Sequence, residues 1–253
     1  MFRVVIPARF GSTRLPGKVL LPLAGKPMIR WVYERACASA ASEVIIATDD
    51  GRVAEAAGAF GAQVVMTASN HPSGTDRIAQ VARERRWRDE DIVVNVQADE
   101  PLIPSAIIGQ VARVLADDPR GALATLATPI TSAEEYLDTH AVKVVRDAQG
   151  RALYFSRAPV PWDREGAAAT PVQFNFAGAL RHIGIYGYRV AALHALTALP
   201  PSPLELRESL EQLRALENGW HWQVALASEP PGPDVNTAQD LQRVGQLLAE
   251  RLA

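Results

Sequence analysis

The first half of the chain alternates short apolar runs with amphipathic stretches, and this alternation constrains the fold more than any other feature of the sequence. β-Branched runs of strand length recur between stretches with helical periodicity. We expect strands at residues 2–6, 44–48, 63–67, 91–97 and 122–127, and helices at residues 27–40, 49–60, 75–87 and 104–116. Repeated strand–helix units predict a three-layer α/β fold, in which helices cover both faces of a mainly parallel, doubly wound sheet.

The alternation changes after about residue 130. Two apolar runs around an Asp-Ala-Gln-Gly turn predict a β-hairpin, and an Ala-rich segment with Gly and Pro predicts a loop. The expected elements are strands at 141–146, 152–156, 181–189 and 220–227, a loop at 162–177, and helices at 203–216 and 237–252. We interpret the second half as an inserted β-rich subdomain followed by the end of the sheet.

Composition narrows the class of protein. With 253 residues, 48% of them hydrophobic and 21% charged, the chain suits one domain with a subdomain and not a disordered protein. A net charge of −2 gives no reason to expect nucleic acid or a membrane surface as partner. The lone Cys37 excludes an internal disulfide framework and fits a cytoplasmic location. No apolar run approaches the roughly 20 residues of a membrane span.

Charge is unevenly distributed at the N-terminus. Residues 1–33 contain no Asp or Glu, but they do contain Arg3, Arg9, Arg14, Lys18, Lys26 and Arg30. A local cationic surface predicts an anionic small-molecule ligand, and the alternative is a chance fluctuation of composition.

A glycine-rich loop, PARFGSTRLPGK at residues 7–18, directly follows the first expected strand. Small residues let backbone N–H groups approach a phosphate, and the three cations of the loop would neutralise it. Five residues separate Gly11 from Gly17, and Val19 follows Lys18, so the loop is not a Walker A motif. It also lacks the G-x-G-x-x-G spacing of dinucleotide-binding folds. The remaining alternative is a simple surface turn.

An acidic segment, NVQADEP at residues 95–101, follows the fourth expected strand. Carboxyl ends of parallel strands meet at one edge of the sheet, where ligands usually bind. Asp99 would there be a natural Mg²⁺ ligand facing a triphosphate. The alternative is that Asp99 or Glu100 caps the next helix.

Other polar segments have both a functional and a structural interpretation. Ser73 or Thr75 is a sound helix N-cap, although either could also bind a pyrimidine edge. Arg77 could reach phosphates or pair with a neighbouring acid. A single arginine at a strand end, Arg157, suits a carboxylate. His182 shares a strand face with Tyr186 in period-two order, but a lone strand histidine is more often structural.

The loop at residues 7–18 resembles the signature of sugar-nucleotide pyrophosphorylases and cytidylyltransferases, and its PAR-x-x-S-T-R-L-P-G-K form is similar to that of the CMP-Kdo synthetase family (3-deoxy-manno-octulosonate cytidylyltransferases). NVQADEP resembles the family's N-V-Q-G-D-E-P, with Ala98 in place of glycine. Further segments are similar in the same order: HPSGTDR at 71–77, ALYFSRAPVPW at 152–162, RHIGIYGYR at 181–189, PLELRESLEQLR at 203–214 and DVNTAQDL at 234–241.

The resemblance implies a nucleotidyltransferase that joins CTP to 3-deoxy-D-manno-octulosonate (Kdo), giving CMP-Kdo and pyrophosphate for lipopolysaccharide synthesis. It implies a catalytic role for Lys18, Arg14 and Asp99. It implies CTP contacts from Ala8, Arg9, Gly11, Ser12, Arg14, Lys18, Ser73, Gly74, Arg77 and Gln97. It implies sugar-acid contacts from Arg157, His182, Tyr186, Glu211 and Gln212, where the alternative for the last two is an ordinary solvated helix.

The resemblance also implies Mg²⁺ as cofactor, with Asp99 as one ligand. The family's second metal-binding aspartate falls on Asn236, whose amide oxygen can coordinate Mg²⁺ but lacks the charge. Asp234 is a possible substitute. The expected parts are 1–130 for CTP, 131–230 for the sugar acid and dimerisation, and 231–253 for the C-terminal helix, in a homodimer. The alternatives are CMP transfer to another acidic sugar, such as 8-amino-Kdo or a nonulosonate, and a non-catalytic nucleotide-binding homologue.

Overall fold

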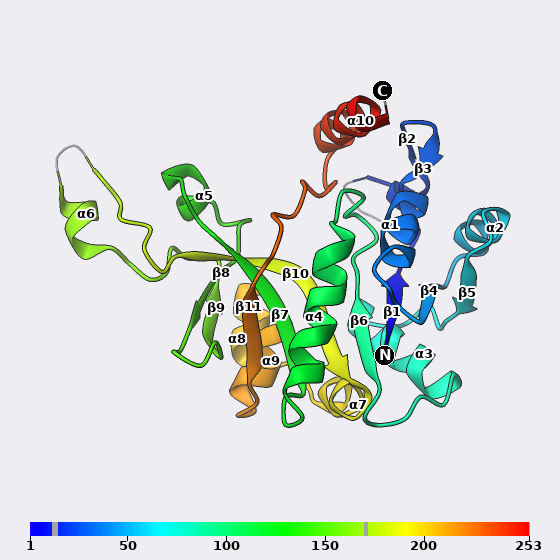
Figure 1. Ribbon diagram of the computed structural model, residues 1–253, viewed down its shortest axis with the longest axis horizontal. Coiled ribbons are helices and arrows are strands. Elements are labelled where there is room, and N and C mark those ends of the chain that lie inside the picture. The colour runs from blue at the N-terminus through cyan, green and yellow to red at the C-terminus, as the bar shows by residue number, and fades with distance from the viewer. Residues whose placement is uncertain (12–14, 170–171, 253) are drawn as a thin grey trace.

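The computed structural model describes residues 1–11, 15–169 and 172–252, without the side chain of residue 252, and its centre is a nine-stranded sheet (Figure 1). The strands are β1 (Phe2–Pro7), β2 (Pro22–Leu23), β3 (Lys26–Pro27), β4 (Glu43–Thr48), β5 (Gln63–Met66), β6 (Ile92–Asn95), β7 (Leu123–Pro129), β8 (Lys143–Arg146), β9 (Ala152–Ser156), β10 (Leu180–Arg189) and β11 (Trp222–Leu226). The main path runs β11-β7-β10-β6-β1-β4-β5, and β2 and β3 form a separate pair.

The sheet is mainly parallel, as the sequence predicts. β1 runs parallel to β4 and β6, β4 to β5, and β11 to β7. β10 is antiparallel to both of its neighbours, β6 and β7, and the β8–β9 hairpin extends from its first residues. The pattern predicts β10 as a strand but not its central place. Both of its faces are covered, because Ile183 and Ile185 lie in one core and Tyr188 in the other.

Helices cover both faces of the sheet, although not every helix of the described chain packs on it. They are the single-turn η1 (Lys18–Leu20), α1 (Met28–Cys37), α2 (Gly51–Ala59), α3 (Gly74–Glu84), α4 (Ser105–Asp117), α5 (Ala133–Leu137), α6 (Arg164–Ala168), α7 (Val190–Ala198), α8 (Pro203–Glu208), α9 (Gln212–Glu217) and α10 (Ala238–Leu252). Side chains of α1, α2 and α4 pack on one face of the sheet, and those of α3, α7 and α9 pack on the other. Alternate residues of β1 divide between these layers, with Val4 and Ile6 in one and Val5 in the other.

The single helix expected at 203–216 is wrong, because the structure has two helices there. Ser209 adopts a left-handed conformation with φ 53°, which ends α8. A buried ion pair joins the two helices across this break, with Arg214 Nη2 2.5 Å from Glu205 Oε1. Glu205 Oε2 also accepts from Ser202 N at 3.0 Å at the start of α8.

The loop expected at 162–177 contains the short helix α6, which starts where the Asp163 side chain accepts a hydrogen bond from Gly166 N. No residue of α6 is buried, so its sequence carries no apolar periodicity to detect. The chain around α6 projects from the body as an arm (Figure 1). Among the described residues, no helix combines the length and apolar character that crossing a membrane requires.

Candidate functional site

The loops after β1 and β6 lie at the same edge of the sheet, because these two strands are parallel neighbours. Ala8 continues the β1 ladder by donating its N–H to Ala47 O at 2.8 Å, and its side chain is fully buried. Gly11 is exposed, and a side chain there would meet nothing within 4 Å. Ser12 and Arg14, both predicted to bind CTP, lie outside the described residues.

Gly17 sets the position of Lys18. Its φ of 67° is left-handed, and a Cβ at this position would approach the Phe10 ring to 3.0 Å, so a glycine is required. The next residue, Lys18, begins η1 and turns its side chain toward the segments after β6 and before α10. Its Nζ donates to Asp99 Oδ2 at 2.7 Å and to Val235 O at 2.9 Å.

Asn236 joins the same cluster, since its Oδ1 lies 3.5 Å from Lys18 Nζ. Its Nδ2 donates to Asp234 Oδ2 at 2.5 Å, so the two alternative ligands predicted from the sequence are in direct contact. Asp99 also receives Val235 N–H at its backbone oxygen, at 2.9 Å. The structure therefore brings together residues 18, 99, 234 and 236 from three distant segments.

The cluster is rich in negative charge. Burial, followed by the charges of Asp99 and Asp234, raises the pKa of Glu100 to about 8. Burial and the Asp99 charge likewise raise the pKa of Asp234. Neighbouring carboxylates repel one another when they are ionised, so a cation among them is favourable. Lys18 is a cation that the structure places there, against Asp99.

The oxygen atoms around Lys18 are of the type that binds Mg²⁺. Lys18 Nζ sits among a carboxylate, an amide oxygen and a backbone carbonyl, which are the hard oxygen donors that this ion prefers. Within the described residues, no group of three or more His, Cys, Asp or Glu side chains could hold a metal by itself. Such an incomplete set is typical of Mg²⁺ sites, in which substrate phosphates and water supply the remaining ligands.

A cavity of about 210 Å³ opens at the same edge, between the ends of β1 and β6 and the start of α3. It is lined mainly by residues predicted to bind CTP: Pro7, Arg9, His71, Pro72, Ser73, Gly74, Arg77 and Gln97. A side chain at position 74 would come within 3.1 Å of the Pro7 ring, so glycine keeps this entrance open. The end of β1, the residue Arg9 after it and the 71–77 segment therefore line one cavity.

Two of these residues also have the structural roles given as alternatives. Ser73 is the N-cap of α3, and its Oγ accepts from Asp76 N at 3.2 Å. Arg77 is 5% exposed, hydrogen-bonds Thr67 Oγ1, and has Nη2 3.4 Å from Asp49 Oδ2. Arg77 therefore pairs with a neighbouring acid, and its contact with nucleotide stays a prediction.

His182 is held inside the sheet. Thr125 Oγ1 lies 2.8 Å from His182 Nε2 and 2.7 Å from the carbonyl oxygen of Ile185. Because that carbonyl can only accept, the hydroxyl donates to it, so Nε2 carries a proton and Nδ1 is the acceptor. Burial, and secondarily the Arg181 charge, lower the pKa of His182 to about 3, so the ring is neutral. This geometry supports the structural interpretation, and sugar binding by His182 stays a prediction.

The other sugar-side residues lie where α9 meets β10. Tyr186 OH donates to Gln212 Oε1 at 3.4 Å, and Glu211 Oε1 accepts from the Thr75 hydroxyl. Gln212 is 3% exposed, and its Nε2 has no acceptor among the described residues, so it could donate to a bound polar group. Since Thr75 follows Gly74 of the small cavity, the two predicted binding regions are adjacent.

Arg157 is held by backbone oxygens. Its Nε donates to Glu208 O at 2.7 Å, its Nη1 to Thr139 O at 3.0 Å and its Nη2 to Ser209 O at 3.5 Å. The Glu208 carboxylate accepts from Arg157 N at 3.0 Å and from the Ser156 hydroxyl at 2.7 Å. Sequence reasoning missed this anchoring role of Glu208, for which the only signal was its place in the 203–214 segment.

Comparisons with known proteins agree with the family that the sequence motifs indicate. The cytidylyltransferase family profile matches residues 3–226. The chain is 55% identical to "3-deoxy-manno-octulosonate cytidylyltransferase" of Thioalkalivibrio sulfidiphilus, over 98% of both chains. It is 56% identical to the protein of the same name in Chromohalobacter salexigens, over 98% of this chain and 96% of that one.

A solved structure shares the whole fold. The structure of "CMP:2-keto-3-deoxy-manno-octonic acid synthetase complexed with CTP" superposes with a TM-score of 0.90, at 42% identity over 99% of this chain and 100% of that chain. The two proteins are therefore similar in both sequence and fold over nearly their full length. The chain belongs to the cytidylyltransferase family, among the 3-deoxy-manno-octulosonate cytidylyltransferases.

Proposed function

We propose that this protein transfers CMP from CTP to Kdo, giving CMP-Kdo and pyrophosphate for lipopolysaccharide synthesis. The observation that carries the proposal is the Lys18–Asp99 pair, 2.7 Å apart, at the carboxyl edge of the sheet beside the 210 Å³ cavity. The names of the relatives and the CTP complex of the 42% identical structure support the choice of both substrates.

The nucleotide side follows from the residues around that cavity. Arg9, the N-terminal turn of α3 and Gln97 bind CTP, and the base lies among the polar groups of the 71–77 segment. Lys18, together with Arg14, holds the triphosphate and then the departing pyrophosphate. An ammonium held in place by Asp99 is already oriented, so it stabilises charge in the transition state without reorganisation.

The sugar side lies next to it. The spare N–H donors of the Arg157 guanidinium, beyond those bound to backbone oxygens, take the sugar carboxylate. Glu211, Gln212, Tyr186 and His182 bind its hydroxyl groups. The anomeric hydroxyl oxygen then forms a bond to the α-phosphorus and gives up its proton to solvent, and the bond from that phosphorus to the pyrophosphate oxygen breaks. Positioning and charge stabilisation provide much of the catalysis.

We propose Mg²⁺ as the cofactor, held by Asp99 and by Asn236, with Asp234 as the substitute for Asn236. When bound, the ion neutralises charge on the α-phosphate and helps to align the attack. The three oxygen-bearing side chains lie within one hydrogen-bonded cluster around Lys18, which supports this ligand set.

We also propose a homodimer, in which residues 131–230 bind sugar and contribute the interface while residues 1–130 bind CTP. Large apolar side chains of the β-rich part face solvent, with Leu153 63%, Trp162 56% and Val172 57% exposed, and covering this apolar surface would favour association. Sedimentation at equilibrium tests this state directly. We place the enzyme in the cytoplasm, where CTP is made.

The deciding experiment measures pyrophosphate release with CTP, Mg²⁺ and one of three acceptors: Kdo, 8-amino-Kdo or N-acetylneuraminate. We expect release with Kdo and none with Asp99→Ala, checked for folding by circular dichroism. Release with another acceptor would keep the chemistry and change the substrate. No release with any acceptor would identify a non-catalytic nucleotide-binding homologue.

A further inference from the structure

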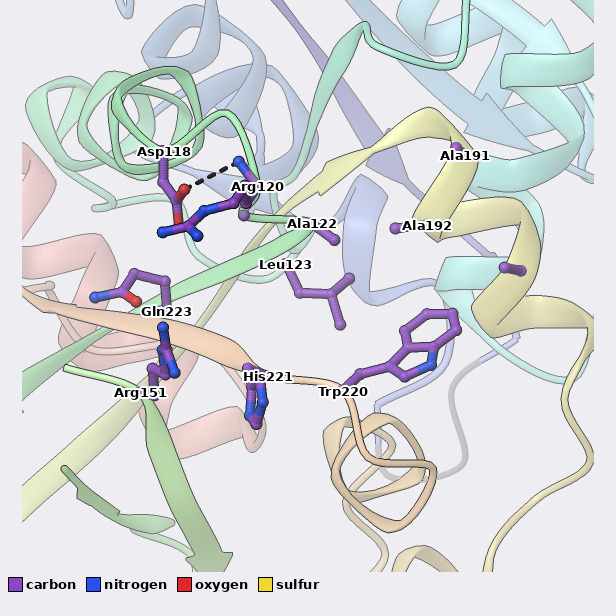
Figure 2. Close-up of a pocket in the computed structure, with 12 residues that line it drawn as sticks. Asp118, Arg120, Ala122, Leu123, Arg151, Ala191, Ala192, Trp220, His221 and Gln223 are labelled. Atoms are coloured by element: carbon purple, nitrogen blue, oxygen red, sulfur yellow. Dashed lines mark hydrogen bonds between the residues drawn. The ribbon is translucent and has the colours of Figure 1, made fainter. Parts of the chain in front are cut away.

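A second cavity, of about 620 Å³, opens at the opposite edge of the sheet (Figure 2). It is formed where β7 and β11 begin and where α7 follows the end of β10, so it lies at the amino ends of the parallel strands. The nucleotide cavity lies at their carboxyl ends. The volume of this second cavity falls within the roughly 300–1,000 Å³ of small-molecule sites, and none of the described residues of the proposed catalytic site lines it.

One wall of this amino-edge cavity is cationic and polar. Arg120, Arg151, His221 and Gln223 lie on it together (Figure 2). Neither guanidinium has an ion-pair partner among the described residues. Asp118 is the acid of the lining, and its Oδ1 accepts the backbone N–H of Arg120 at 3.0 Å. The wall therefore has an excess of hydrogen-bond donors with positive charge.

The backbone of this wall is fixed. Arg151 N donates to Asp147 Oδ1 at 2.8 Å, and Arg151 forms an isolated β-bridge with Gln223. The Gln223 amide nitrogen in turn donates to Gln149 O at 2.8 Å. These contacts fix the backbone at Arg151, and its exposed side chain lies at the cavity with no ion-pair partner among the described residues.

The facing wall is apolar. Trp220, Leu123 and Ala192 lie on this side, across from the arginines (Figure 2). Leu123 is 1% exposed and Ala192 is 9% exposed, so both belong to the packed core and form a rigid surface. Trp220 is half-buried, so part of its indole remains available to a flat ligand.

We infer that the amino-edge cavity is a second ligand site, which binds a small aromatic anion. The ring lies against Trp220 and Leu123, and a phosphate or carboxylate group faces Arg120 and Arg151. Bidentate guanidinium contacts suit both groups, and the opposite wall selects a flat apolar body. The site is independent of CTP, because the two cavities share no lining residue.

The test titrates the full-length protein with phenyl phosphate, benzoate and uncharged phenol, by calorimetry and in saturating CTP. We expect one equivalent of at least one anion to bind, and phenol to bind about ten-fold or more weakly, because charge-assisted hydrogen bonds are lost. Comparison of phenyl phosphate with benzoate shows which acid group the site prefers. One-dimensional ¹⁹F spectra of protein labelled with 5-fluorotryptophan should show a shift that is missing in Trp220→Phe.

Two sets of variants locate the site. Arg120→Gln/Arg151→Gln should weaken anion binding by about ten-fold or more, and Ala195→Glu, which adds a carboxylate at an exposed lining position, should do the same. The matched control, Arg83→Gln/Arg251→Gln, removes equal charge from exposed positions outside the cavity and should leave binding unchanged. Loss of the anion on adding CTP, equal binding of phenol, unaltered binding by both sets of variants, or no binding of either anion would each overturn the inference.

Discussion

Replacing Lys18 with methionine is the sharpest test of the proposed catalytic site. Methionine keeps the length and apolar character of the side chain and removes only the ammonium. That group bonds Asp99 Oδ2 at 2.7 Å and Val235 O at 2.9 Å, and its side chain is 14% exposed. If Lys18 stabilises the triphosphate, the loss should affect turnover far more than folding.

The expected loss of turnover is much larger than the expected loss of unfolding stability. A unit charge about 4 Å from another contributes about 4 kcal/mol at an effective dielectric constant of about 20. Loss of one preorganised transition-state contact costs about 3–4 kcal/mol, or about 10²–10³-fold in turnover. Asp99 is 28% exposed and can be hydrated after the change. Unfolding stability should therefore fall by only about 1 kcal/mol.

Lys26→Met is the matched control. Its ammonium lies 2.7 Å from Glu34 Oε2 in an ion pair that is similarly part-exposed, but this pair joins β3 to α1 and neither residue lines the cavity. The assay follows pyrophosphate release with CTP and Kdo, alongside urea unfolding of both variants. Lys26→Met should keep turnover within about two-fold. Refutation would be a folded Lys18→Met enzyme that retains more than about a tenth of wild-type turnover.

Asn236→Asp should lower the Mg²⁺ concentration for half-maximal rate, because it adds a carboxylate beside Lys18 Nζ; an unchanged Mg²⁺ dependence would show that Asn236 is not a ligand or already suffices. Trp222→Phe removes the indole donor to Gln212 O, at 2.9 Å, from a residue that is 1% exposed. It should cost about 1–3 kcal/mol of stability and raise the KM for Kdo while the KM for CTP stays constant; equal changes in both would contradict the placement of Gln212. His182→Gln should flatten the acid side of the stability profile. Since the folded pKa of His182 is about 3, only the unfolded chain binds this proton between about pH 3 and 6.5, so stability falls as pH drops, by up to about 1.4 kcal/mol per unit. Urea titrations should show that the free energy of unfolding changes less between pH 7 and pH 5 in the variant than in the parent.

The parallel part of the fold could be predicted because its signals are local. Each strand–helix unit carries its own apolar period, and parallel strands bring their carboxyl ends to one edge. That rule predicts that the loop after the first strand and the acidic segment at 95–101 lie at one edge, and in the structure Lys18 and Asp99 meet there across 81 residues of sequence. The central position of β10 was not predictable, because its apolar pattern fits an edge hairpin as well as a strand inserted between β6 and β7.

The sugar side was harder to predict because its contacts are tertiary. The sequence shows Arg157 at a strand end, but not that the backbone oxygens of Thr139 and Glu208 hold its guanidinium. Nor does it show that a bulge in β10 brings the Ile185 carbonyl to Thr125 and so fixes the tautomer of His182. Glu205 and Arg214 lie nine residues apart, which is not the i,i+3 or i,i+4 spacing of helical ion pairs, and they form a buried pair because the break at Ser209 brings α9 against α8.

The two edges of the sheet differ in a way that explains why only one was visible in the sequence. At the carboxyl edge, each loop supplies several residues that are neighbours in the sequence, so the candidate site residues form contiguous motifs. At the amino edge, Arg120, Arg151 and Trp220 each come from a different turn, and none belongs to a motif. A site assembled from single residues is detectable only after folding. For the same reason its side chains can be changed without disturbing the loop around Lys18, so the two sites can be tested separately.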